Sequence, residues 1–146
     1  FDLGLFSDPE VNSAVQNFLQ WESENHVEWL ASEVQVGSLV NGFAGILDFL
    51  AIVNGVETLG DFKTSSGIRA EAYIQTAGLW ICLEEMGWTP KQRLILHLPK
   101  DDEPFEARIV PTDIQKDKEA FLVGLLFYRH MNIFKSRNGE RKWVNQ

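Results

Sequence analysis

Two apolar segments separated by Asn54-Gly55 constrain the fold of this chain most strongly. Residues 43–53 and 56–64 are both rich in apolar side chains. An Asn-Gly pair between two such runs is the strongest short-range signal for a two-residue β-hairpin turn. Such a turn places Val53 opposite Val56 and, by the same count, Asp48 opposite Asp61. Because both runs are apolar on both faces, we expect a central pair of strands that is covered on each side.

The patterns on either side of this hairpin predict alternating helices and strands. We expect a helix from Pro9 to about Asn25, a strand over 33–40, a helix over 68–86, a hairpin from strands 93–99 and 105–110, and a last helix. Thr112, with Gln115 completing a capping box, is expected to begin that last helix. The sequence therefore predicts one α/β domain over residues 1–146, with a mixed central sheet flanked by helices in the order α-β-β-β-α-β-β-α.

Composition excludes several classes of protein. The net charge is −8, and residues 1–62 contain no Lys or Arg, so bulk positive charge cannot hold nucleic acid. A local basic patch, or acids neutralised by a metal ion, stays compatible with this charge. The single Cys82 excludes a disulfide framework and fits the cytoplasm. No apolar run approaches the roughly 20 residues that span a bilayer, so we expect no membrane association. Because Phe1 is not Met, we expect a missing N-terminal segment.

The predicted hairpin brings two carboxylates and an amine together. Residues directly opposite each other have Cβ atoms about 4.5–5.5 Å apart, so Asp48 and Asp61 share one face. Lys63, two residues after Asp61, lies on the same face. Two buried carboxylates repel each other, and burying them unpaired costs several kcal/mol, whereas Lys63 alone compensates only one of the two charges. A hard divalent cation resolves this conflict and would bind a phosphate. The alternative is a partly solvated Asp-Lys-Asp cluster at the end of a strand, without function.

Weaker candidates surround this cluster. The hydroxyls of Thr64, Ser65 and Ser66 suit a phosphate oxygen at the start of the next helix, or they serve only as helix caps. Arg69 would contact a DNA backbone or be a solubilising surface residue. His97, in an apolar strand, is expected to be a half-buried histidine with a hydrogen-bond partner and not a metal ligand.

At these residues the chain resembles the PD-(D/E)XK nuclease superfamily, most closely its RecB-type and phage exonuclease branch. Three segments carry the resemblance: Gly45-Ile-Leu-Asp48, then Gly60-Asp61-Phe-Lys63-Thr64-Ser65, then a helix with Tyr73 and Gln75. The similarity in motif order and spacing extends from about residue 8 to residue 128. The resemblance implies a restriction-endonuclease-like αβββαβ core.

The resemblance also implies a function and a set of site residues. The protein would be a magnesium-dependent deoxyribonuclease, with Mn²⁺ as a substitute, that hydrolyses phosphodiester bonds. The branch favours an exonuclease of bacterial or phage DNA processing and recombination in the cytoplasm, with DNA and a strand-annealing protein as partners. The family roles map as follows: metal ligands Asp48 and Asp61, catalytic lysine Lys63, outer metal ligand Glu33, and DNA-positioning residues Gln75, Thr64, Ser65 and Tyr73.

The chain departs from the family pattern at three positions. Leu47 replaces the proline of the family name, and Leu79 stands where a tyrosine usually follows the helix glutamine. His26 is badly placed for the family's metal-binding histidine, which we expect upstream of Phe1. A catalytically inactive nuclease fold that binds DNA or protein is therefore an alternative, and a small-molecule phosphohydrolase is another. Exonuclease or endonuclease action, strand preference and oligomeric state stay open.

Overall fold

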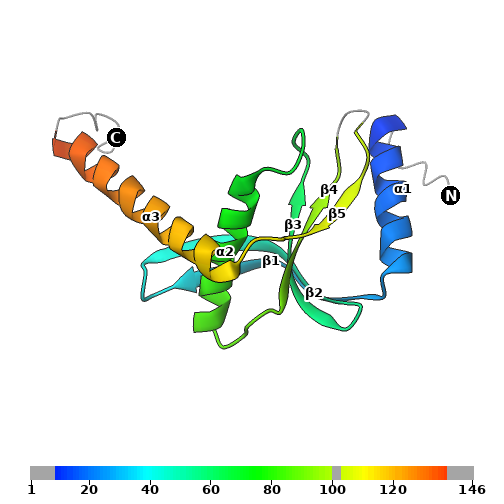
Figure 1. The fold of residues 1–146 in the computed structure, drawn as a ribbon, viewed down its shortest axis with the longest axis horizontal. Helices are drawn as coiled ribbons and strands as arrows, with labels where there is room; N and C mark the ends of the chain where they lie inside the picture. The colour runs from blue at the N-terminus through cyan, green and yellow to red at the C-terminus, as the bar shows by residue number, and fades with distance from the viewer. Residues whose placement is uncertain (1–8, 100–102, 138–146) are drawn as a thin grey trace.

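A computed structural model describes residues 9–99 and 103–137. The elements are α1 (Pro9–Glu24), β1 (Val27–Ser38), β2 (Phe43–Val53), β3 (Val56–Lys63), α2 (Ala70–Glu85), β4 (Gln92–His97), β5 (Glu106–Ile109) and α3 (Ile114–Arg137) (Figure 1). This order is the predicted one, and it confirms a mixed α/β fold. Within the two described ranges, no helix is long and apolar enough to cross a bilayer.

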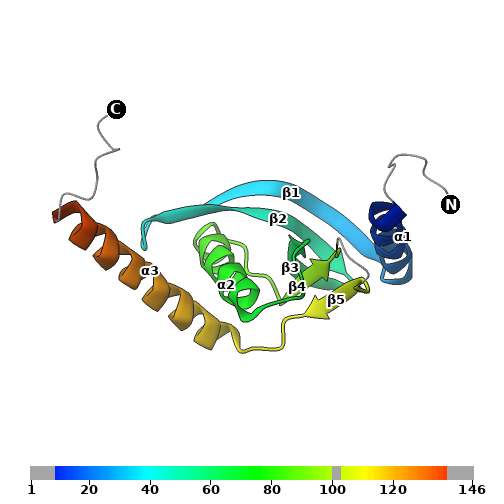
Figure 2. The same ribbon diagram turned by 90° about the horizontal axis from the view of Figure 1, so that it is seen from above.

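The strands form one mixed sheet in the order β1-β2-β3-β4-β5. β3 and β4 are parallel and are connected through α2, whereas the other neighbouring pairs are antiparallel. β2 and β3 are interior strands, as their continuous apolar sequences predict. Figure 2 shows α2 on the concave side of the strongly curved β1 and β2, with α1 at the far end of the sheet.

The β2–β3 hairpin has the predicted register. Val53 pairs with Val56, and the ladder continues to Phe49 opposite Gly60. Asn54 and Gly55 have φ angles of 50° and 82°, the left-handed values that a two-residue turn of this kind requires. The absence of a side chain at Gly60 makes room for the ring of Phe49, since a Cβ atom there would lie 1.8 Å from the Phe49 Cζ atom. Asp48 and Asp61 are the next residues along the two strands, directly beyond this last pair.

Apolar side chains cover both faces of the sheet. The cluster beneath α2 contains Val36, Leu47, Leu59, Trp80, Cys82 and Leu83. The cluster toward α1 contains Phe49, Ala51, Val53, Leu94 and Leu96, with Phe18 and Trp21 of the helix packed against it. These clusters make the sheet a rigid support, so side chains at the ends of β3 and β4 have fixed positions.

Arg93 of β4 connects the sheet to α2 and α3. Its buried guanidinium donates hydrogen bonds to the Tyr73 carbonyl, the Thr112 carbonyl and Asp117 Oδ2, the last at 2.8 Å. A buried cation with this many partners holds its neighbours in one arrangement, because breaking any bond leaves an unpaired buried group.

Several predicted helix ends and strand ends are wrong. Thr112 does not cap α3, since Asp113 directly before Ile114 accepts the Lys116 N–H at 3.0 Å and the Thr112 hydroxyl bonds to Asp117. β1 begins at Val27 and not at residue 33, because it pairs with β2 along almost its whole length, past a register shift between Trp29 and Ala31. The hydroxyls after Lys63 do not cap α2 either, whose N-cap is Arg69 without a side-chain hydrogen bond.

Candidate active site

The hairpin and α2 bring four of the predicted residues together on one face of the sheet. The Asp48 carboxylate reaches across to β3, where its Oδ2 atom accepts the Phe62 backbone N–H at 2.7 Å. Lys63 Nζ lies 3.0 Å from Asp61 Oδ2 and donates a hydrogen bond to Gln75 Oε1 at 3.1 Å. The site is therefore a pair of neighbouring carboxylates beside an ammonium group that α2 holds from the other side.

Asp61 is the electrostatically unusual member of this group. Burial raises the pKa of its carboxyl from 3.8 to about 6, a rise that the Lys63 ammonium opposes and the Asp48 carboxylate reinforces. Its Oδ2 atom is buried, lies 3.0 Å from Lys63 Nζ in an ion pair, and has no hydrogen-bond partner among the described residues. A buried carboxylate oxygen is costly without a compensating charge, and the Lys63 ammonium is the cation beside this atom.

The donor set fits a magnesium ion. Mg²⁺ prefers oxygen ligands and is commonly held by one or two carboxylates, with waters and substrate phosphate in the other positions. Asp48 and Asp61 supply two neighbouring carboxylates, of which Asp61 Oδ2 makes no hydrogen bond with the described residues and forms an ion pair with Lys63. The described ranges contain no group of three or more His, Cys, Asp or Glu placed to share a metal ion. These two residues are therefore the ones that would hold the ion.

Glu33 and His26 lie outside the carboxylate pair. Glu33 is an exposed residue of β1. Its neighbours Ser32 and Val34 pair with Phe49 and Leu47, so Glu33 lies across from Asp48 on the adjacent strand. Its φ of 51° is unusual for a residue other than glycine and breaks the regular alternation of the strand. It does not complete a three-acid group. His26 is an exposed residue in the turn between α1 and β1, away from the site.

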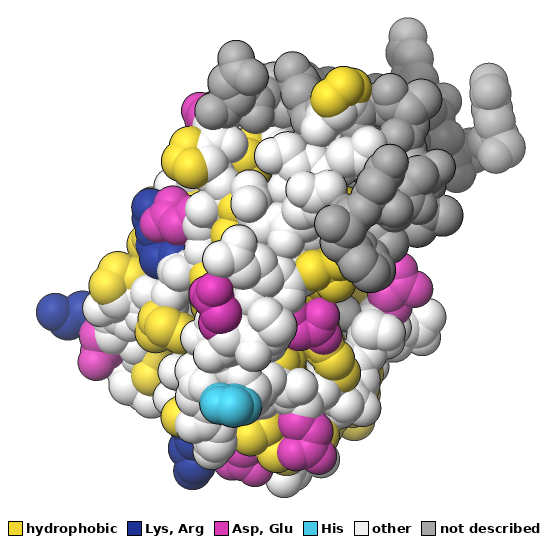
Figure 3. All heavy atoms as spheres, turned by 90° about the vertical axis from the view of Figure 1, so that its right-hand side faces the viewer, with side chains coloured by type: hydrophobic (Ala, Val, Ile, Leu, Met, Phe, Trp, Pro, Cys, Tyr) yellow, Lys and Arg dark blue, Asp and Glu magenta, His cyan; other side chains and the backbone are white. Residues whose placement is uncertain are grey.

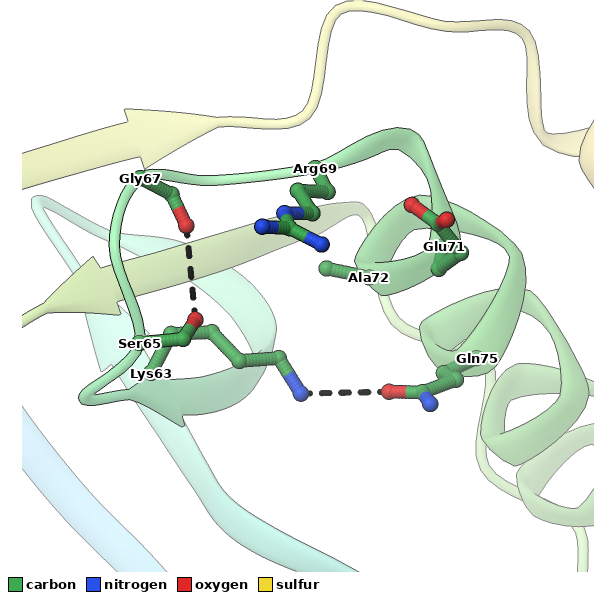
Figure 4. A pocket seen from close by; sticks show the side chains of 7 residues that line it. All are labelled: Lys63, Ser65, Gly67, Arg69, Glu71, Ala72 and Gln75. Carbon is green, nitrogen blue, oxygen red and sulfur yellow. Dashed lines mark hydrogen bonds between the residues drawn. The ribbon is translucent and has the colours of Figure 1, made fainter.

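A pocket of about 290 Å³ lies against Lys63, between the β3–α2 loop and the first turns of α2 (Figure 4). Lys63, Ser65 and Gln75, all predicted site residues, line it together with Arg69 and Glu71. Thr64 is exposed beside it. The Tyr73 hydroxyl accepts a hydrogen bond from Arg108 of β5 at 3.0 Å, so this side chain is held by the sheet. The sequence does not single out Glu71 as a pocket residue, because an acid in the first turn of a helix is ordinary.

β4 supports the loop that carries this pocket. The Leu98 backbone N–H donates to the Lys63 carbonyl at 2.8 Å, which extends the parallel pairing to the last residue of β3. His97 is buried, and its Nε2 atom lies 2.5 Å from the Ser65 carbonyl oxygen. The prediction that His97 has a hydrogen-bond partner is confirmed, and its burial is more complete than expected. These two bonds therefore fix the backbone around Lys63 and Ser65.

Charge is distributed unevenly around the molecule. The face at the α1 end carries scattered acidic side chains, with Lys and Arg confined to its edges (Figure 3). This follows from the absence of Lys and Arg in residues 1–62.

Comparison of the chain with protein-family models and with curated proteins finds no match.

Proposed function

We propose that this protein is a magnesium-dependent DNA nuclease of the PD-(D/E)XK type, in which Asp48 and Asp61 bind the metal ion. The observation that carries the proposal is a buried carboxyl, Asp61, beside the half-buried Asp48, with Lys63 Nζ 3.0 Å from Asp61 Oδ2. The element order α-β-β-β-α-β supports the restriction-endonuclease-like core that the sequence motifs imply. Exonuclease action, a role in bacterial or phage recombination with a strand-annealing partner, and a cytoplasmic location rest on the resemblance alone.

Each residue of the site has a distinct task in phosphodiester hydrolysis. When bound, Mg²⁺ supplies positive charge to the phosphate and a water molecule of lowered pKa. The Phe62 N–H holds the Asp48 carboxylate, and Gln75 holds the Lys63 ammonium, which also pairs with Asp61. Lys63 donates hydrogen bonds to the attacking water or to a phosphate oxygen. Fixed charges placed in this way accelerate a reaction because they need little reorganisation in the transition state.

A nuclease fold that binds DNA or protein without cutting is the second candidate. Two observations favour it: the net charge of −8, and the absence of a third carboxylate beside Asp48 and Asp61 within the described ranges. In this case the carboxylate pair would be a remnant, and Lys63 would serve only to neutralise Asp61. The two candidates differ in one outcome, the cleavage of DNA in the presence of Mg²⁺.

The test is hydrolysis of linear duplex DNA in Mg²⁺ or Mn²⁺ by the wild type and by Asp61→Asn and Lys63→Met. We expect each variant to lose at least about 100-fold in rate while retaining the wild-type circular dichroism spectrum. Glu28→Gln and Lys91→Met are matched controls, because both side chains are exposed and distant from the pair, and they are expected to cut normally. Wild-type rates in both site variants would refute the proposed mechanism. DNA binding without any cleavage by the wild type would favour the second candidate.

A further inference from the structure

Arg69 is a second cation that lines the same pocket as Lys63. Lys63 is held by Asp61 and Gln75, whereas the Arg69 guanidinium makes no ion pair or hydrogen bond with any residue of the described ranges. Figure 4 shows this guanidinium directed into the pocket, above the bond between Lys63 and Gln75. An arginine that is unpaired and directed into a concave surface is well suited to bind an anion, since its planar donors match a phosphate.

The remaining groups of the pocket set its preference. The Ser65 hydroxyl makes only a long hydrogen bond of 3.4 Å to the Gly67 carbonyl, so it is free to turn toward a ligand. Gly67, with a φ of 77°, gives the loop its bend, and no atom lies within 4 Å of the position of a Cβ atom there. Glu71 opposes an anion, and its carboxylate lies on the same side of the pocket as the Arg69 guanidinium, away from the bond between Lys63 and Gln75 (Figure 4).

We propose that this pocket binds a backbone phosphate of the DNA strand, next to the phosphate that is cleaved. The proposal rests on the proposed function, since it assigns a part of the substrate to the same site. Lys63 borders both the carboxylate pair and the pocket, so a strand that lies across Asp61 continues into the pocket. Arg69 would bind the phosphate through its planar donors, and Ser65 would donate one hydrogen bond. A DNA strand carries a charged phosphate at every nucleotide, so neighbouring sites of this kind would bind successive phosphates of one strand.

The test is the salt dependence of binding to a fluorescently labelled oligonucleotide, single-stranded and duplex, in EDTA so that metal-dependent cleavage does not occur. Affinity is measured between about 50 and 200 mM salt for the wild type, Arg69→Gln, Glu71→Gln and Lys91→Gln. We expect Arg69→Gln to reduce the slope of log K against log salt by about 0.7 to 0.9, the value of one lost phosphate contact. Glu71→Gln is expected to tighten binding. Lys91→Gln is the control, because Lys91 precedes β4 at the end opposite Lys63.

The outcomes separate the pocket from the nuclease activity. An unchanged slope in Arg69→Gln, with cleavage still lost in Asp61→Asn, would overturn the pocket and leave the proposed function intact. A wild type that neither binds nor cuts DNA would overturn both. Inorganic phosphate is the second probe: calorimetric binding that Arg69→Gln abolishes, with an unchanged DNA slope, would make this a small-anion site and overturn the proposal. A lower slope in Arg69→Gln and a wild-type slope in Lys91→Gln support it.

Discussion

Replacement of Asp61 by Asn is expected to stabilise the metal-free protein above neutral pH. The reason is that the Asp61 carboxyl is buried beside Asp48, so its charged form is destabilised in the folded state. The amide of Asn has nearly the same shape as the protonated carboxyl and cannot ionise. The substitution therefore removes the cost of ionisation and keeps the packing of β3.

The magnitude follows from the pKa. The carboxyl has a pKa of about 6 in the folded protein, against 3.8 for the unfolded reference. At about pH 4 the unfolded state has only begun to lose its proton, so the penalty is small, and well below that pH both states are protonated and no penalty applies. As the pH rises from there to about 6, the folded state keeps a proton that the unfolded state has released, so stability falls. Above that range the full penalty remains, about 3 kcal/mol for a pKa of about 6 in place of 3.8.

The assay is urea denaturation followed by tryptophan fluorescence, in EDTA, at about pH 4 and about pH 8. Asp61→Asn is expected to match the wild type at the lower pH and to exceed it by about 2 to 3 kcal/mol at the higher pH. Glu28→Gln removes an exposed acid and is the control, with the pH dependence of the wild type. A variant that is less stable than the wild type at about pH 8 would refute the reasoning, because the ion pair with Lys63 would then outweigh the cost of burial.

Two further predictions concern the fold. Gly60→Ala is expected to destabilise the protein by about 1–3 kcal/mol or more in denaturant titration, because its Cβ atom would overlap the Phe49 ring. The control is Gly124→Ala, whose Cβ atom would have nothing within 4 Å, and it is expected to be neutral or stabilising by up to about 1 kcal/mol. Equal effects of the two substitutions on stability would contradict the packing of the hairpin. Arg93→Met leaves the Asp117 carboxylate without its buried partner, so it is expected to lower the free energy of unfolding by about 3–5 kcal/mol and to speed amide hydrogen exchange in α3. Unchanged exchange would contradict the role of this ion pair.

The hairpin and the carboxylate pair were predictable because their causes are local. Asn54-Gly55 permits the positive φ angles of a two-residue turn, and the turn then fixes the register of every pair along the two strands. Counting along the ladder, which ends at Phe49 and Gly60, makes Asp48 and Asp61 the next residues on the two strands, and the Asp48 carboxylate bonds to the backbone of Phe62. Lys63 shares their face because side chains alternate along a strand. The periodic apolar residues of the helices gave their existence and order, as expected for amphipathic segments.

The pocket and the caps were not predictable, because they depend on contacts between distant segments. Tyr73 is held by Arg108 of β5, a residue 35 positions later, and no local pattern indicates this bond. Thr112 and Asp113 are both good caps, and the choice between them depends on where α3 packs and on the bond from Thr112 to Asp117. Arg69 and Glu71 become pocket residues only through the path of the β3–α2 loop over β4.

The central claim, that Asp48 and Asp61 together bind one divalent cation, is tested most directly by calorimetric titration with Mn²⁺ and Mg²⁺. We expect the wild type and the control Glu28→Gln to bind one ion, and Asp48→Asn and Asp61→Asn each to lose that binding while remaining folded. Bound metal should also raise the denaturation midpoint of the wild type at about pH 8, since it stabilises the ionised Asp61 carboxylate. Absence of binding at millimolar metal, or equal binding by wild type and Asp61→Asn, would contradict the account.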